Sequence, residues 1–185
     1  MSIWFTSDHH FFHKNILKYC GRPFKNLEEM HEMMIKNWNS KIKPSDTVYY
    51  LGDFGLGPKQ LMKELMVKLN GKRKILIKGN HDKSDASMLE IGFTEIHKYM
   101  DLNYQNVSIF LSHVPMRSIY HRLVLCGHVH EKMKVNGNIY NVGVDVNDFT
   151  PISIDEILIN YWKTLKEGKF IPMEFKIEGE DEQKI

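Results

Sequence analysis

The feature that most constrains this chain is the alternation of short apolar segments with helical repeats over its first half. Residues 3–6, 47–51 and 75–77 are apolar, rich in β-branched and aromatic side chains, and each ends at a polar or glycine-containing break. Between them, apolar residues recur at helical spacing over 26–40, after Asn26, and again after Pro58. Strands joined by helices pair in parallel and are covered on both faces. The first half therefore predicts an α/β arrangement.

The second half changes to strands separated by short turns. A capping pattern at Ser153 and Glu156 predicts a last helix to about residue 165, and residues 178–185 form an acidic tail expected to be frayed. No linker interrupts the chain, so one domain over 1–177 is expected, with two sheets packed face to face and helices outside. The strands expected here are 93–99, 107–111, 123–126, a hairpin through 136–138, and 171–177.

Length and composition narrow the class of protein. A chain of 185 residues with 42% hydrophobic residues suits one globular domain. Its apolar runs are far shorter than the ~20 residues that span a bilayer, and its start lacks a basic segment followed by an apolar one. Two cysteines favour a reducing compartment, and a net charge of +2 argues against a dedicated nucleic-acid binder. We expect a cytoplasmic protein with no membrane and no stable nucleic-acid partner.

Ten histidines are many for a chain of this kind, and most of them follow expected strands. The carboxyl ends of strands in α/β sheets border the crevice where ligands bind, so loops distant in sequence converge there. Each motif alone is also ordinary loop chemistry, whereas the five strand ends together predict a metal site. The candidate ligands are Asp8, His10, Asp53, Asn80, His81, His113, His128 and His130.

The donor types narrow the choice of metal. Imidazole combined with carboxylate and amide oxygen suits Mn, Fe, Zn or Ni, and a shared carboxylate suits two ions. No cysteine stands in these motifs, which argues against a closed structural zinc site.

Five sequence blocks, taken in order, resemble the calcineurin-like metallophosphoesterase superfamily. The blocks are DHH at 8–10, GD at 52–53, GNHD at 79–82, SH at 112–113 and GHVH at 127–130. The short length, RPF at 22–24 and NVGVDV at 141–146 are similar to the small bacterial and phage branch.

The resemblance implies a four-layer α/β/β/α sandwich of two mixed sheets with two divalent metal ions at the sheet edge. It assigns Asp8, His10 and His130 to one ion and Asn80, His113 and His128 to the other, with Asp53 bridging. The implied reaction is in-line attack on phosphorus by a hydroxide held between the ions. His81 would be the general acid or transition-state donor, with Asp82 orienting it.

Departures from the family pattern narrow the range of expected substrates. Phe-Gly-Leu-Gly follows Asp53 where phosphoprotein phosphatases and dinucleoside tetraphosphate hydrolases carry a further Asp-Arg-Gly element. The chain also lacks room for lipid-binding or capping insertions, which favours a small phosphodiester or phosphomonoester, nucleotide-derived esters among them. The choice between diester and monoester stays open. His9 either hydrogen-bonds at the site or points away from it. Candidate substrate contacts are His13, Asn15, Arg22 and Arg117, although both arginines are equally explained as surface residues.

Two other functions remain alternatives. Retromer's metallophosphoesterase-like subunit uses a similar fold as a protein-binding scaffold, so a non-catalytic scaffold is one. A nuclease acting on short single strands is the other, although the sequence shows no basic groove interleaved with aromatic residues.

Overall fold

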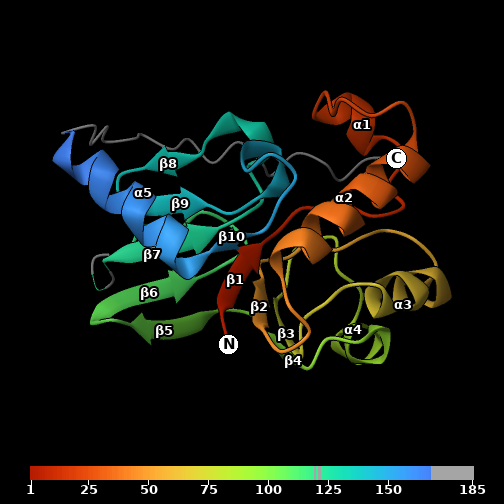
Figure 1. Ribbon diagram of the computed structural model, residues 1–185, viewed down its shortest axis with the longest axis horizontal. Helices are drawn as coiled ribbons and strands as arrows, with labels where there is room; N and C mark the ends of the chain where they lie inside the picture. Colours follow the sequence, from red (N-terminus) through yellow and green to blue (C-terminus); the bar gives the residue numbers. More distant parts are fainter. Residues whose placement is uncertain (119, 121, 168–185) are drawn as a thin grey trace, which may run out of the picture.

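The computed structural model describes residues 1–167 except 119 and 121, and the expected strand at 171–177 and the acidic tail lie outside these residues. Two five-stranded mixed sheets, flanked by helices, make up the fold (Figure 1). The predicted α/β class is confirmed. Within the described residues, no helix is both long and apolar enough to cross a bilayer.

The first sheet has the order β10-β1-β2-β3-β4 and is parallel except at one edge. Its strands are β1 (Ile3–Thr6), β2 (Thr47–Tyr50), β3 (Arg73–Ile77), β4 (Glu95–His97) and the antiparallel β10 (Ile152–Ser153). The second sheet has the order β5-β6-β7-β9-β8, with β6, β7 and β9 parallel. Its strands are β5 (Met100–Tyr104), β6 (Val107–Leu111), β7 (Leu123–Cys126), β8 (Val135–Asn136) and β9 (Ile139–Asn141).

The two longest helices begin at residues whose side chains cap them. The Asn26 side chain accepts a hydrogen bond from the Glu29 amide, and Ser153 and Glu156 form a reciprocal capping box. The helices are α1 (Ile16–Tyr19), α2 (Leu27–Lys41), α3 (Lys59–Val67), α4 (Asp85–Ile91) and α5 (Ile154–Lys166), with 3-10 turns η1 (His130–Lys132) and η2 (Val144–Val146).

Some elements were not predicted, and each gives a weak sequence signal. The helix α4 has seven residues, of which only Met88 and Ile91 are buried, so it lacks a repeating apolar stripe. The strand β5 lies at a sheet edge and is half exposed along its length. The segment predicted as one strand over 93–99 is shorter, since regular pairing covers only Glu95–His97.

The sheets bury both faces of their central strands. In β2, Val48 and Tyr50 pack against α2, α3 and α4, whereas Tyr49 and the following Leu51 face the second sheet. The helix α5 runs beside β1 and β10 and contributes apolar side chains to the core between the sheets (Figure 1). Two hydrophobic layers therefore fix the strands whose ends carry the polar loops.

The carboxyl ends of the parallel strands from both sheets meet at one edge. An isolated parallel bridge pairs Ser7, after β1, with Gly143, after β9. The Val144 amide also donates a hydrogen bond to the Ser7 carbonyl at 3.2 Å. Loops from two separate sheets are thereby joined where the candidate ligands lie.

Candidate metal centre

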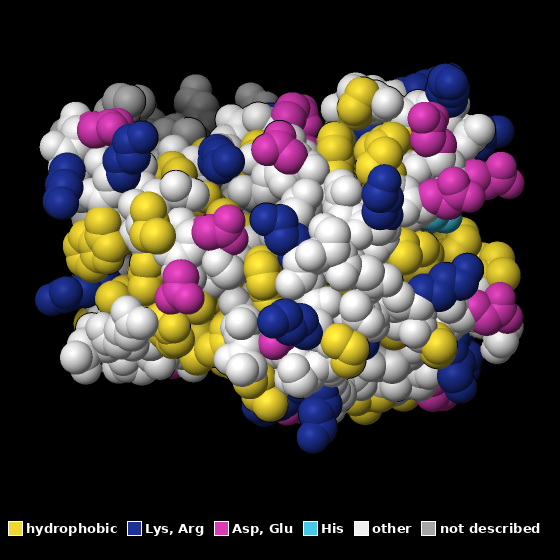
Figure 2. All heavy atoms as spheres, in the orientation of Figure 1, with side chains coloured by type: hydrophobic (Ala, Val, Ile, Leu, Met, Phe, Trp, Pro, Cys, Tyr) yellow, Lys and Arg dark blue, Asp and Glu magenta, His cyan; other side chains and the backbone are white. Residues whose placement is uncertain are grey.

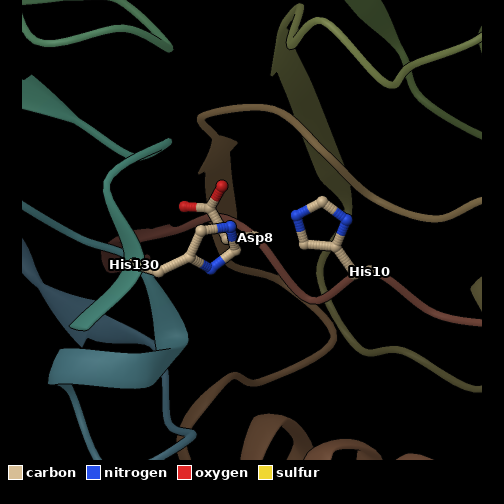
Figure 3. A group of neighbouring side chains, drawn as sticks. All are labelled: Asp8, His10 and His130. Atoms are coloured by element: carbon tan, nitrogen blue, oxygen red, sulfur yellow. The ribbon is translucent and has the colours of Figure 1, made fainter. Parts of the chain in front are cut away.

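The structure brings together the seven residues that the family resemblance assigns as metal ligands. They come from loops after β1, β2 and β3 in one sheet and after β6 and β7 in the other. Figure 3 shows Asp8, His10 and His130 pointing into a common space from loops of the two sheets. The ligand atoms of these three residues lie within 4.8 Å of one another, as do those of Asp53, His113 and His128.

Asp53 belongs to the second of these groups and also approaches the first. Its Oδ2 atom is 3.5 Å from Nε2 of His10 and 3.3 Å from Nε2 of His113, so one carboxylate contacts a member of each group. The Oδ1 atom of Asn80 lies 3.0 Å from the same Nε2 of His113, which places the amide with the second group. This is the arrangement that a carboxylate shared by two ions requires.

Backbone strain is concentrated at these ligands. Asp8, His10, Asp53, His128 and His130 have φ angles of 61°, 51°, 62°, 70° and 47°. A residue other than glycine adopts this left-handed region at a cost, and such strain persists where the surrounding structure over-determines it. Here the surrounding sheets hold the ligands in a converging geometry.

Two glycines allow the loops to approach each other closely. A Cβ atom at Gly79 would collide with the carboxylate and backbone of Asp53, and one at Gly127 would collide with Ser7 and Asp8. The glycines of the GNHD and GHVH blocks therefore make room for the ligands of neighbouring loops.

The donor set leaves polar atoms that a divalent ion would satisfy. Both ring nitrogens of His10 are buried and have no hydrogen-bond partner among the described residues. Buried polar atoms are nearly always paired in folded proteins. Imidazole and carboxylate groups of this kind are ligands for first-row divalent metals. The residues thus fit the ions that the sequence pattern implies.

Hydrogen bonds orient two of the imidazoles. His113 donates from Nδ1 to the Leu51 carbonyl at 2.7 Å, which directs Nε2 toward Asp53. His130 donates from Nδ1 to Asp145 at 2.8 Å, which leaves Nε2 for an ion. Carboxylates and carbonyls behind metal-binding histidines fix the ring tautomer and raise the basicity of the ligand.

Asp145 was missed in the sequence, although it follows a strand end just as the predicted ligands do. It lies in η2, after β9, and it is held by Arg22. The Cys20 thiol also lies within 4.8 Å of the ligand atoms of His130 and Asp145. A thiol therefore lies beside the site, although no cysteine stands in the five motifs.

Arg22 has a structural role in place of the predicted phosphate contact. The residue is 4% exposed, and its guanidinium binds Asp145 through Nε and Nη2, at 2.7 and 2.9 Å. The same group donates to the carbonyls of Asp8 and His9 at 2.6 and 2.7 Å. The guanidinium thus anchors the first metal-binding loop to the loop that carries Asp145.

Burial and neighbouring charges shift the pKa values of the carboxylates and imidazoles in the site. Burial alone would raise the pKa of Asp53, but the hydrogen bond and charge of His113 hold that pKa at about 2. Burial opposes the charged form of His130, yet its hydrogen bond to Asp145 raises its pKa to about 10. Burial lowers the pKa of His10 to about 3. Binding of a cation here would therefore release a proton from His130, whereas His10 is already neutral.

Comparison with known families decides the identity of the fold. A family model described as calcineurin-like phosphoesterase matches residues 1–158. The chain belongs to this family. The five blocks found in the sequence lie inside the matched region, which covers both described sheets.

Individual proteins are also similar to this chain. An uncharacterized protein of Methanocaldococcus jannaschii is 35% identical over 181 residues, covering 91% of this chain and 94% of that protein. A structure of a protein of unknown function from Aquifex aeolicus matches with 30% identity and a TM-score of 0.72, covering 86% of this chain and 98% of that one. Gene 66 protein of Mycobacterium phage L5 is 34% identical over 83 residues, covering 44% of this chain and 40% of that protein.

In the family's GNHD block, His81 lies at the exposed mouth of the site. Its amide donates to Oδ1 of Asp53 at 3.0 Å, and its ring centroid is 5.4 Å from that of His10. Asp82 does not orient the His81 ring as predicted. Its carboxylate accepts hydrogen bonds from the amides of Asp53, Phe54 and Gly79 at 2.8–3.0 Å, so it fastens two ligand loops together.

The other three predicted substrate contacts differ in how close they lie to the metal ligands. His13 is half-buried with its ring centroid 5.6 Å from that of His10, and its Nδ1 has no hydrogen-bond partner among the described residues. Asn15 is exposed at the start of α1 and donates to the Tyr19 hydroxyl at 3.4 Å. Arg117 is exposed in the loop that follows His113. His13 is therefore the one of these three shown beside a ligand.

His9 points away from the metal ligands. Its ring is fully buried, stacks on Phe11, and shares a 2.6 Å hydrogen bond between Nδ1 and the Tyr50 hydroxyl. Burial lowers its pKa to about 3. Of the two roles considered for His9, the structure shows the one in the core under α2.

Proposed function

We propose that this protein hydrolyses a small phosphate ester with two divalent metal ions held by the seven ligands. The observation that carries the proposal is the position of Asp53, whose carboxylate contacts His10 of one ligand group and His113 of the other. Family membership supplies the reaction class, a phosphoester hydrolase.

The ions would activate a water for attack and neutralise charge on the phosphoryl oxygens. Asp8, His10 and His130 would hold one of them, and Asn80, His113 and His128 the other, with Asp53 shared. The protein's own part is to fix these groups before substrate arrives. Arg22 and Asp82 do so, because each binds backbone atoms of ligand loops.

His81 is the proton donor in this proposal. It is exposed, adjacent to the ligand Asn80, and held at the site by its own amide on Asp53. An imidazole there can deliver a proton to the ester oxygen that leaves as the P–O bond breaks. His13, near the same side of His10, lies where it would contact that leaving group.

Hydrolysis of p-nitrophenyl phosphate and bis-p-nitrophenyl phosphate tests the proposal. The protein is stripped with a chelator and reloaded separately with Mn, Ni, Zn or Mg. We expect turnover that depends on added metal and is lost in Asp53→Asn. On phenyl phosphate, whose poorer leaving group needs the proton, His81→Ala should lose about 10²-fold or more, and it should lose less on the p-nitrophenyl esters. The matched control is Asp148→Asn, which removes an exposed carboxylate after η2. Equal turnover in all variants would refute the proposal.

The same experiment distinguishes the two alternatives. A scaffold would bind metal weakly and hydrolyse neither ester, and a nuclease would cleave short single strands in preference to both. Figure 2 shows acidic and basic side chains interspersed over one face of the molecule, without the continuous basic stripe of a nucleic-acid groove on that face.

Both thiols, Cys20 and Cys126, are unpaired, which supports the reducing cytoplasm as the proposed compartment.

A further inference from the structure

A cavity of about 460 Å³ adjoins the metal centre on the side of the second ligand group. Asn80 and His113, which belong to that group, form part of its wall. The remaining wall comes from the end of β3, the start of α4, the β4–β5 connection and the residue after His113. We call this space the side cavity; its wall beyond the two ligands includes Lys78, Ile96, His97, Lys98, Tyr99 and Val114.

The side cavity is bordered by an aromatic ring and the ammonium of Lys98, whereas Lys78 in its wall is paired with Asp85. The Tyr99 ring is stacked on Phe110, with centroids 5.7 Å apart and an interplanar angle of 26°, and the residue remains 44% exposed. Val114, which also lines the side cavity, is 46% exposed. The ammonium of Lys98 lies 5.4 Å from the centroid of the Tyr99 ring. Such a surface suits a planar group that carries hydrogen-bond acceptors.

The position of the side cavity matters because the proposed proton donor lies elsewhere. His81 and His13 gather around His10, the ligand of the first group. The side cavity instead adjoins His113, and Asp53 lies between His10 and His113. An ester phosphate at Asp53 would therefore have its leaving group on the His81 side and a second substituent facing the side cavity. A phosphomonoester has no second substituent.

The volume fits a substituent much larger than a methyl group. Ligand sites typically occupy about 300–1,000 Å³. A second cavity, of about 660 Å³, lies beside α1 and the start of α2 and is lined by Lys14, Asn15 and Lys18 among others. No predicted metal ligand lines that second cavity, so of these two spaces the side cavity is the one continuous with the centre.

We infer that the substrate is a phosphodiester whose non-leaving substituent is a planar, nucleoside-sized group bound in the side cavity. The inference rests on the proposed function and specifies its substrate class. The reaction is hydrolysis of one P–O bond. Water adds to phosphorus and gives up a proton to solvent, the leaving alkoxide takes a proton from His81 that solvent then restores, and the phosphomonoester product keeps the nucleoside.

Three esters with one common leaving group test the inference. They are thymidine 5′-p-nitrophenyl phosphate, methyl p-nitrophenyl phosphate and p-nitrophenyl phosphate, all of which release p-nitrophenolate. With the metal-loaded protein, we expect kcat/KM for the thymidine ester to exceed that for the methyl ester by at least tenfold. Equal values for the two diesters would overturn the inference and leave the proposed function standing. Turnover of none of the three would instead refute the proposed function and the inference with it.

Two substitutions locate the preference. Tyr99→Ala removes the stacking surface and Val114→Trp fills the side cavity, so each should reduce the ratio of thymidine to methyl ester turnover at least fivefold. Val67→Trp, at a residue 80% exposed on α3, is the matched control and should keep the wild-type ratio. Metal content and circular dichroism are measured for every variant. If one side-cavity variant does not fold, the other still decides, and an unchanged ratio in a folded, metal-loaded variant contradicts the inference.

Discussion

The carboxylate of Asp145 accepts a hydrogen bond from Nδ1 of His130 at 2.8 Å and is itself held by two nitrogens of Arg22. These hydrogen bonds connect a buried guanidinium, a carboxylate and a predicted metal ligand in series. Because Arg22 also binds the carbonyl of Asp8, the hydrogen-bond network extends to the loop that carries the first ligands. The candidate metal centre is therefore supported by residues outside the seven predicted ligands.

The first prediction concerns this support. Asp145→Asn should weaken divalent metal binding about 10- to 100-fold, because the neutral amide no longer raises the basicity of the His130 ring. Isothermal titration with Mn²⁺ measures the change. Asp148→Asn, three residues along the chain, is the control and should bind as the wild type does. Unaltered affinity in Asp145→Asn would show that the hydrogen bond does not tune the ligand.

Arg22 is predicted to matter for stability rather than for substrate affinity. Arg22→Lys keeps the charge but loses the paired hydrogen bonds to Asp145, and it should lower the free energy of unfolding by about 3 kcal/mol. Arg73→Lys, at an exposed pair with Glu95, should cost less than about 1 kcal/mol. Urea unfolding compares the two variants. A stable Arg22→Lys protein with a KM raised tenfold would restore the phosphate-binding role.

Asp82 is predicted to act through the backbone of the ligand loops. In Asp82→Asn, one side-chain atom becomes a donor facing amides that are themselves donors, so the free energy of unfolding should fall by about 2 kcal/mol. The apparent pKa of the acid that governs kcat should stay where it is in the wild type. A shift of that pKa without loss of stability would show that Asp82 orients His81 after all.

Stability should fall as the pH drops below about 6.5. Burial lowers the pKa of His31 to about 4 and that of His9 to about 3, so both are neutral in the folded protein at pH values where the unfolded chain protonates them. The unfolded state then binds more protons, and each histidine costs about 1 kcal/mol between pH 7 and pH 5.5.

His31→Gln tests this pH dependence, because glutamine can still accept the hydrogen bond that the Phe12 amide donates to His31. Urea unfolding in a chelating buffer at the two pH values should give a drop about 1 kcal/mol smaller in the variant. The same drop in both proteins would contradict the assignment of a neutral His31.

The sequence predicted that the candidate ligands gather at one edge because of how parallel strands meet. Asp8, Asp53 and His113 follow apolar strands, and such strand ends share an edge whatever the details of packing. Arg22 was misjudged because residue type alone does not reveal that a guanidinium is buried. Asp145 was overlooked because β9 is only three residues long, so the strand end before it was hard to recognise. Both depend on contacts between segments more than 100 residues apart, which no local pattern encodes.

The count of bound ions tests the metal centre most directly. The chelated protein is dialysed against Mn²⁺, and bound metal is measured by mass spectrometry for the wild type, Asp53→Asn and Asp148→Asn. Two ions per chain are expected in the wild type and in Asp148→Asn, and fewer in Asp53→Asn because both ligand groups lose the carboxylate between them. Two ions retained in Asp53→Asn, or none bound by the wild type, would contradict a centre built around Asp53.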